Sequence, residues 1–126
     1  MARVTGIGGI FFKANDLDAS KQWYQTNLGI DIQQWNGAAF EWRERDQPDR
    51  TGATVWSLFA HDSNYFAPSE APFMINYRVD NLDELLAQLR AAGVTVDEQV
   101  ADLEYGRFGW IMDPDGNRIE LWEPRA

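Results

Sequence analysis

Residues 10–32 (IFFKANDLDASKQWYQTNLGIDI) and residues 75–96 (INYRVDNLDELLAQLRAAGVTV) are two copies of one pattern. Both contain the pair Leu-Asp at the same place, and after a slip of one residue Gly29 aligns with Gly93, 64 positions later. An internal repeat constrains a fold before any local assignment, because each copy is expected to form the same structural unit. The chain is therefore predicted to consist of two similar halves.

Each copy is predicted to form a strand, a helix and three further strands. The first strands, near residues 7–13 and 73–79, are rich in apolar and aromatic residues and lack proline. In the second helix Asn81 is a typical N-cap, leucines recur with helical spacing, and Gly93 ends the pattern. The later strands are expected at residues 30–35, 38–43 and 53–59 in the first copy and at 94–98, 106–112 and 117–122 in the second.

The composition argues against several classes of protein. The 126 residues suit a single domain over residues 1–126, with internal halves at about 1–60 and 73–126. The 20 acidic and 11 basic residues give a net charge of −9, which argues against binding to nucleic acid or to a membrane surface. The absence of cysteine excludes disulfides and thiolate chemistry. No apolar run is long enough to span a membrane, so the sequence predicts a cytoplasmic protein.

Alternation along the strands predicts which side chains share a face. Asn76 and Arg78 lie opposite the residues of their strand that are expected to pack against a helix. The same reasoning places six residues on one concave face and predicts them to bind a substrate: Phe11, Trp56, Asn76, Arg78, Glu120 and Trp122. Aromatic walls with a few polar groups are typical of a small-molecule site. The alternative is that this face is simply solvated, as one face of an antiparallel sheet often is.

Three motifs carry a resemblance to a known family: DLDASKQWYQTNLG, VDNLDELLAQLRAAGV and MDPDGNRIELWEP. They resemble the vicinal oxygen chelate superfamily, which includes glyoxalase I, bleomycin and fosfomycin resistance proteins and extradiol dioxygenases. The resemblance implies the α+β fold class, with two tandem βαβββ modules forming an open barrel-like mixed sheet around a cavity and the helices outside. It also implies a homodimer, to which Trp23, Trp35 and Trp42 would contribute where they are exposed.

The positions that hold a metal ion in the metal-dependent members of this family are mostly replaced here. Counted from the helix caps, the resemblance places them at Gly9, Trp56, Met74 and Glu120. Only Glu120 offers a ligand suited to a hard divalent cation, and such sites typically need three or more protein ligands. The only histidine, His61, lies off these positions. We therefore expect no metal ligands and no cofactor.

Two classes of function follow from these observations. The first is binding of a small aromatic or cationic organic molecule without chemistry, as in the bleomycin resistance proteins that the chain resembles. The alternative is an enzyme, either a metal-dependent lyase or dioxygenase with rearranged ligands or a metal-free acid–base catalyst that uses Glu120. Three roles stay open for Glu120: an ion pair with Arg78 or Arg118, acid–base catalysis, and binding of a cationic ligand.

Four aromatic residues have no assigned place at this point. Tyr65, Phe66 and Tyr105 lie in segments that either pack on the barrel or cover the mouth of the cavity, and we favour packing. Trp110 cannot be assigned to a face, because a shift of one residue at the turn over residues 113–116 would move it to the other side of the sheet.

Overall fold

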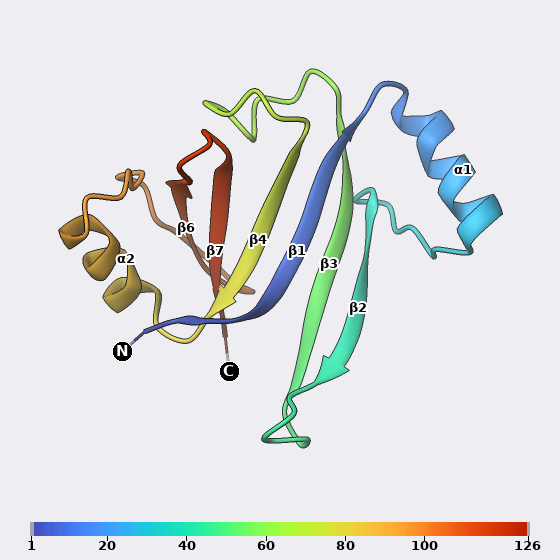
Figure 1. The fold of residues 1–126 in the computed structure, drawn as a ribbon. Coiled ribbons are helices and arrows are strands. Elements are labelled where there is room, and N and C mark those ends of the chain that lie inside the picture. The colour runs from blue at the N-terminus through green and yellow to red at the C-terminus, as the bar shows by residue number, and fades with distance from the viewer. Residues whose placement is uncertain (1, 126) are drawn as a thin grey trace.

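The computed structural model describes residues 2–125 and confirms the predicted α+β class (Figure 1). Its elements are β1 (Val4–Ala14), α1 (Leu17–Leu28), β2 (Gly37–Arg43), β3 (Thr51–Ala60), β4 (Phe73–Val79), α2 (Leu82–Ala91), β5 (Ala101–Leu103), β6 (Gly106–Met112) and β7 (Arg118–Pro124). Both halves begin with the predicted strand and helix. Neither helix in this part of the chain is long and apolar enough to cross a membrane.

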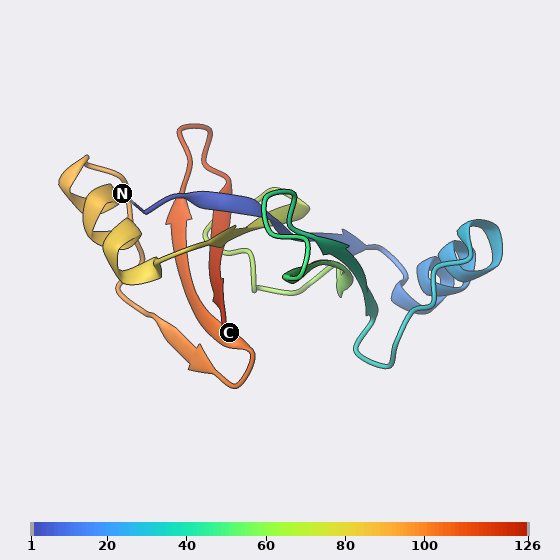
Figure 2. The same cartoon turned by 90° about the horizontal axis from the view of Figure 1, so that it is seen from below.

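The strands of residues 2–125 form one seven-stranded mixed sheet, in the order β2-β3-β1-β4-β7-β6-β5. At its centre β1 and β4, the first strands of the two halves, pair antiparallel. Each also pairs in parallel with the last strand of its own half, β1 with β3 and β4 with β7. The sheet curves without closing into a barrel, and α1 and α2 lie at opposite ends of the molecule (Figure 2). The two copies therefore share one open sheet.

Capping residues define where both helices begin. The side chain of Asp16 accepts a hydrogen bond from the Ala19 backbone N–H, and Asn81 accepts one from Glu84 in the same way. Such an acceptor satisfies one of the free N–H groups of the first helical turn. Helix α1 ends at Gly29, whose φ of 68° favours glycine. These local signals place the helices where the sequence predicted them.

The two faces of β4 contact different clusters, as the alternation predicted. On one side Val79 packs with α2 and β7, through Leu82, Leu86 and Leu121 among others. A second cluster on the other side contains Phe11, Phe66, Met74, Phe108 and Trp110. Helix α1 differs from α2 because none of its residues is buried. The second cluster belongs to the concave side of the sheet, where the site lies.

Two of the predicted strands are not formed. Residues 30–35 lead without strand pairing into a turn in which Asn36 has a φ of 72°, and yet Ile32 is buried. Residues 94–98 contribute only an isolated bridge between Val96 and Ile111, and the short β5 follows them instead. Alternating apolar residues indicate only that one side of a segment is buried. A segment that packs on the protein without pairing to a strand has the same pattern.

Candidate functional site

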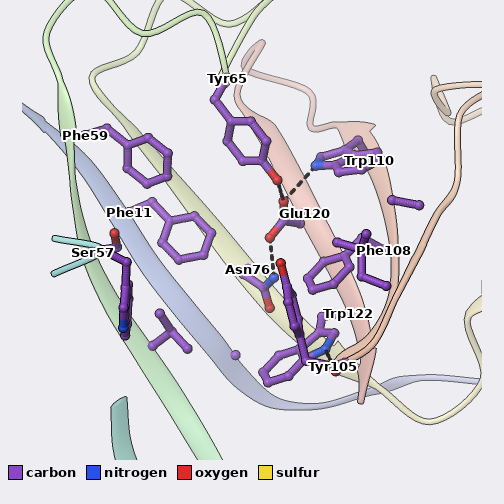
Figure 3. Close-up of a pocket in the computed structure, with 15 residues that line it drawn as sticks. Phe11, Ser57, Phe59, Tyr65, Asn76, Tyr105, Phe108, Trp110, Glu120 and Trp122 are labelled. Atoms are coloured by element: carbon purple, nitrogen blue, oxygen red, sulfur yellow. Dashed lines mark hydrogen bonds between the residues drawn. The ribbon is translucent and has the colours of Figure 1, made fainter. Parts of the chain in front are cut away.

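The concave face of the sheet encloses a cavity of about 740 Å³ (Figure 3). Every second side chain of a strand points to the same face, so strands that are distant in the sequence converge on this space. Its aromatic walls include Phe11, Phe59, Tyr65, Phe108, Trp110 and Trp122. Few polar side chains line it, chiefly Ser57, Asn76 and Glu120. The cavity therefore has the composition of a small-molecule site.

Glu120 lies at the centre of this site and is only 2% exposed. Asn76, its neighbour across the β4–β7 pair, donates from Nδ2 to Glu120 Oε1 at 2.6 Å. Trp110, its neighbour across the β6–β7 pair, donates from Nε1 to Oε2 at 2.9 Å, and the Tyr65 hydroxyl also donates to Oε2 (Figure 3). Among residues 2–125 no basic side chain forms an ion pair with Glu120. The ion pair with a neighbouring arginine, one of the roles left open by the sequence, is not formed.

The donors around Glu120 are neutral groups, and they suit an ionised carboxylate because that group can only accept hydrogen bonds. Burial raises the pKa of the Tyr65 phenol, and the charge of Glu120 together with their hydrogen bond raises it further. The phenol therefore keeps its proton at neutral pH and remains a donor. Glu120 thus lies inside an aromatic cavity with three neutral hydrogen-bond donors and without an ion pair to any side chain of residues 2–125.

Tyr65 reaches the site from the connection between β3 and β4. The backbone carbonyl of Tyr65 accepts a hydrogen bond from Arg118 Nη1 at 2.5 Å, and Arg118 also pairs with Asp97 at 3.5 Å. Next along the chain, Phe66 is fully buried. This connection therefore packs on the sheet, as expected, but it also supplies a polar group to the site, which the sequence did not predict.

The side-chain amide of Asn76 has one orientation that fits its surroundings. Because Glu120 Oε1 only accepts, Nδ2 faces it and Oδ1 points the other way. Oδ1 is buried and has no hydrogen-bond partner among residues 2–125. Beside it, a Cβ atom at Gly8 would lie 2.1 Å from Oδ1 and 2.9 Å from the Trp122 ring. Gly8 is therefore required by this close approach, because Oδ1 and the Trp122 ring fill the space that a side chain there would occupy.

Arg78 lies beside the cavity and is not part of its lining. Its guanidinium stacks on Trp42 at 4.8 Å and lies 5.8 Å from the ring of Trp122. Burial lowers the pKa of Arg78, and its Nε and Nη1 atoms have no hydrogen-bond partner in the described chain. Arg78, predicted to lie on the cavity face, therefore packs against the rings of Trp42 and Trp122 outside the lining of the cavity.

The prediction that Trp56 faces the cavity is wrong. Its indole packs against Tyr24 of α1 at 5.0 Å and against Phe12 at 5.4 Å, on the opposite side of the sheet. The register of β1 and β3 places Ser57 beside Phe11, so Ser57 is the polar residue of β3 that faces the cavity. The sequence prediction matched Trp56 to Glu120 across the repeat, whereas Ser57 is the residue of β3 that faces the cavity as Glu120 does. A shift of one residue exchanges the two faces of a strand.

Four of the six predicted residues line the cavity, namely Phe11, Asn76, Glu120 and Trp122. Trp110 joins them because β6 and β7 pair in a register that places it directly opposite Glu120. The turn between these strands determines the register: Asp113 Oδ1 accepts hydrogen bonds from the backbone N–H groups of Asp115 and Asn117. The residue types of this turn were visible in the sequence, but its exact length was not.

The donor groups at the positions of the family metal site are few. Gly9 has no side chain, and Met74 is buried in the second cluster. Ser57 takes the cavity-facing position on β3, and both oxygens of Glu120 already accept hydrogen bonds. Within residues 2–125 no three His, Cys, Asp or Glu side chains come together as metal ligands would. This donor set does not match the imidazole and carboxylate ligands that zinc, nickel or iron prefer.

A curved mixed sheet made of two repeated halves around a cavity defines a recognisable class of protein. The model of the Glyoxalase/Bleomycin resistance protein/Dioxygenase superfamily matches residues 6–121, and the chain therefore belongs to this superfamily. The match confirms the resemblance carried by the three sequence motifs. A search of curated proteins found no match.

Solved structures share the fold. A variant of methylmalonyl-CoA epimerase from Streptomyces coelicolor is 21% identical with a TM-score of 0.71, and 98% of this chain and 100% of that chain are covered. Methylmalonyl-CoA epimerase from Mycobacterium tuberculosis is 21% identical with a TM-score of 0.61, covering 98% and 90%. The Mn(II)-bound glyoxalase from Novosphingobium aromaticivorans is 22% identical with a TM-score of 0.63, covering 100% of this chain and 43% of that one. Likeness at these identities shows the fold alone.

Proposed function

We propose that this protein binds a small aromatic or cationic organic molecule in its cavity, and that it does so without a divalent metal ion. The observation that carries the proposal is Glu120, a carboxylate that is 2% exposed, lies in an aromatic cavity and has only neutral donors around it. Aromatic faces attract cations and stack on planar rings. The aromatic side chains that line the cavity would therefore stabilise a ligand that is either cationic or aromatic.

The size and the edge of the cavity support binding of a small molecule. A volume of about 740 Å³ lies within the range of about 300–1,000 Å³ typical of ligand pockets. Trp35 and Tyr105 line it from opposite edges of the sheet, and they are 51% and 59% exposed. A bound molecule would cover these large rings, which gives binding an apolar driving force.

A metal-free site follows from the same donor set. Glu120 would have to give up hydrogen bonds from Tyr65 or Trp110 to coordinate an ion through Oε2. Neither Gly9 nor Met74 would replace the lost contacts with a hard ligand. Elemental analysis of protein purified without chelators tests this: a stoichiometric divalent metal that disappears in Glu120→Ala would contradict it.

Acid–base catalysis by Glu120 is the second candidate function. It is favoured by one observation: Oε1 accepts a single hydrogen bond from the described chain, so one of its lone pairs is not used by residues 2–125. A carboxylate with a free lone pair in a largely apolar cavity can take a proton from a substrate. Turnover of a carbonyl compound that is lost in Glu120→Gln, with binding retained, would favour this enzyme over a binding protein.

A thermal-shift screen separates these functions. The protein is heated with metal salts and with small aromatic, cationic and dicarbonyl compounds, each with and without chelator, since a ligand that binds only the native state raises the melting temperature. Stabilisation by an organic compound in the presence of chelator is the expected result. Stabilisation by metal alone would contradict the binding proposal and favour a metal-dependent lyase or dioxygenase.

We also propose that the protein forms a homodimer. Several large apolar side chains outside the cavity are exposed, including Ile10 at 45%, Trp23 at 54%, Phe40 at 51% and Leu28 at 60%. Exposed apolar groups of this size are typical of association surfaces. The expected molar mass in light scattering after size exclusion is twice that of the chain, and a mass of 14.4 kDa would contradict the dimer.

A further inference from the structure

The sheet of residues 2–125 has two edge strands, and they differ in how open they are to a further strand. β5 has only three residues, whereas β2, the outermost strand on its side, has seven and pairs with β3 in an uninterrupted register (Figure 1). β2 contains no proline and no lysine, which commonly protect a sheet edge, and its residues 39–41 are exposed. A long and regular edge of this kind is a place where another strand can add.

The hydrogen bonds of the β2–β3 hairpin show which backbone groups of β2 point away from the sheet. At the two ends of the hairpin, Leu58 N–H donates to the Asn36 carbonyl at 2.9 Å and Glu44 N–H donates to the Arg50 carbonyl at 3.0 Å. In an antiparallel pair, residues that exchange hydrogen bonds alternate with residues that do not. The even-numbered residues of β2 therefore bond to β3. After Gly37, the N–H and carbonyl groups of three residues point outward: Ala39, Glu41 and Arg43.

Two of these residues carry opposite charges that residues 2–125 do not neutralise. Glu41 and Arg43 are both exposed, and neither forms an ion pair within this part of the chain. Arg43 Nη1 donates to the Pro48 carbonyl at 3.1 Å, which holds the guanidinium beside the strand. Opposite charges that face each other across paired strands are stabilising, and like charges are destabilising. The edge is therefore complementary in charge to a second copy of itself.

Symmetry and charge select one register for a pair of β2 strands. A closed dimer has a two-fold axis, and an axis perpendicular to the sheet makes the two strands antiparallel. Centred on Glu41 or on Arg43, this pair would place like charges opposite each other. Centred on Trp42, it places Glu41 of each copy opposite the partner's Arg43. A shift in the other direction would need the Gly37 carbonyl, which already accepts a hydrogen bond from the Gln33 N–H at 2.8 Å.

We propose that β2 pairs with β2 of a second copy of this chain, in the register centred on Trp42, so that one sheet runs through both copies. Glu41 forms an ion pair with the partner's Arg43, and these two residues exchange two backbone hydrogen bonds. The inference rests on the proposed homodimer and names the surface that forms it. It does not involve the cavity, so the proposals about a ligand are tested separately.

Reversal of one charge at a time tests this register. Glu41→Arg places arginines opposite each other across the axis, and Arg43→Glu places glutamates there. Each variant should raise the dissociation constant of the dimer by about tenfold or more, measured by sedimentation of a dilution series at low ionic strength. An equimolar mixture of the two variants should dimerise as tightly as wild type within about threefold, because glutamate faces arginine again in the mixed dimer. A mixture that stays monomeric would overturn the inference.

The matched control is Glu104→Arg. Glu104 is exposed in the turn between β5 and β6, at the other edge of the sheet from β2. Both Glu104→Arg and Glu41→Arg reduce the net negative charge of the chain by the same amount, which by itself lowers the repulsion between two copies. The control should therefore associate at least as tightly as wild type, within about twofold, whereas Glu41→Arg should associate more weakly. Equal weakening in both variants would overturn the inference.

Amide hydrogen exchange on the wild-type protein needs no variant and stays decisive if the variants do not fold. The backbone N–H groups of Glu41 and Arg43 point outward, so they are protected only when a second strand pairs with β2. Their exchange should slow by about tenfold or more at protein concentrations well above the dissociation constant of the dimer. Unchanged exchange of both amides on dimerisation would overturn the inference.

The same measurements separate this inference from the homodimer proposal on which it rests. A wild-type dimer that neither charge reversal weakens overturns the pairing of β2 but leaves the homodimer in place, formed through another surface. A wild-type chain that stays monomeric at millimolar concentration overturns both.

Discussion

The substitution Tyr65→Phe removes one donor from the buried carboxylate and keeps the aromatic ring. The Tyr65 ring stacks on Phe59 with a centroid distance of 5.6 Å and an interplanar angle of 13°, so its apolar packing is preserved. Glu120 Oε2 keeps the Trp110 donor at 2.9 Å and loses the phenol. The measured change therefore reports the hydrogen bond and little else.

The expected loss of stability can be estimated from the geometry. A hydrogen bond to a charged group contributes about 1.5–3 kcal/mol. Tyr65 is 38% exposed, so water partly replaces the lost donor, and we expect about 1–2 kcal/mol. For a chain of this length the melting temperature should fall by about 3–10 °C.

The pH dependence of the stability gives a second, independent test of this hydrogen bond. The folded-state pKa of Tyr65 is raised above its ordinary value of 10.0, so above that pH the native state holds a proton that the unfolded chain releases. The stability that this hydrogen bond gives to the wild type is complete below pH 10 and declines as the pH rises further. Because the Phe variant has no such group, its deficit should be largest at neutral pH and smaller in alkali.

Urea unfolding followed by tryptophan fluorescence measures both effects, at pH 7 and at about pH 10.5. Tyr105→Phe is the control, because Tyr105 is 59% exposed and its hydroxyl makes no hydrogen bond with residues 2–125. The control should match wild type within about 0.5 kcal/mol. An unchanged stability for Tyr65→Phe at pH 7, or an equal deficit at both pH values, would refute the reasoning.

Three further substitutions test other parts of the structure. Gly8→Ala should lower stability in urea unfolding by about 1–3 kcal/mol, because its Cβ would overlap with Asn76 Oδ1 at 2.1 Å; unchanged stability would contradict this close approach. Leu86→Ala, in the α2 core at 2% exposure, should cost about 2–5 kcal/mol in urea unfolding, and a loss below about 1 kcal/mol would contradict its packing. Trp56→Ala should cost about 3 kcal/mol by removing contacts with Tyr24, yet leave unchanged the binding of any organic compound that the thermal-shift screen identifies; weaker binding would return Trp56 to the cavity.

Much of the site could be anticipated from one strand face. The alternation in β4 separated Met74 and Asn76 from the residues that pack on α2, and the structure confirms this separation. The same method failed for β3, where Trp56 and Ser57 exchanged roles. The difference lies in the neighbouring segment. β4 leads directly into a helix whose N-cap can be identified in the sequence, which fixes the position of the strand. β3 follows a polar turn, and the length of that turn does not determine the pairing register of the strand.

Local signals in the sequence determined the two similar halves, the beginnings of both helices and the α+β class, because caps and apolar periods act between residues a few positions apart. Only the tertiary structure decided what surrounds Glu120. Its donors Trp110, Asn76 and Tyr65 come from 10, 44 and 55 positions away, and they meet the carboxylate through strand register and the path of one connection. Because a shift of one residue in any of these pairings turns a side chain to the other face of the sheet, the site depends on the whole fold.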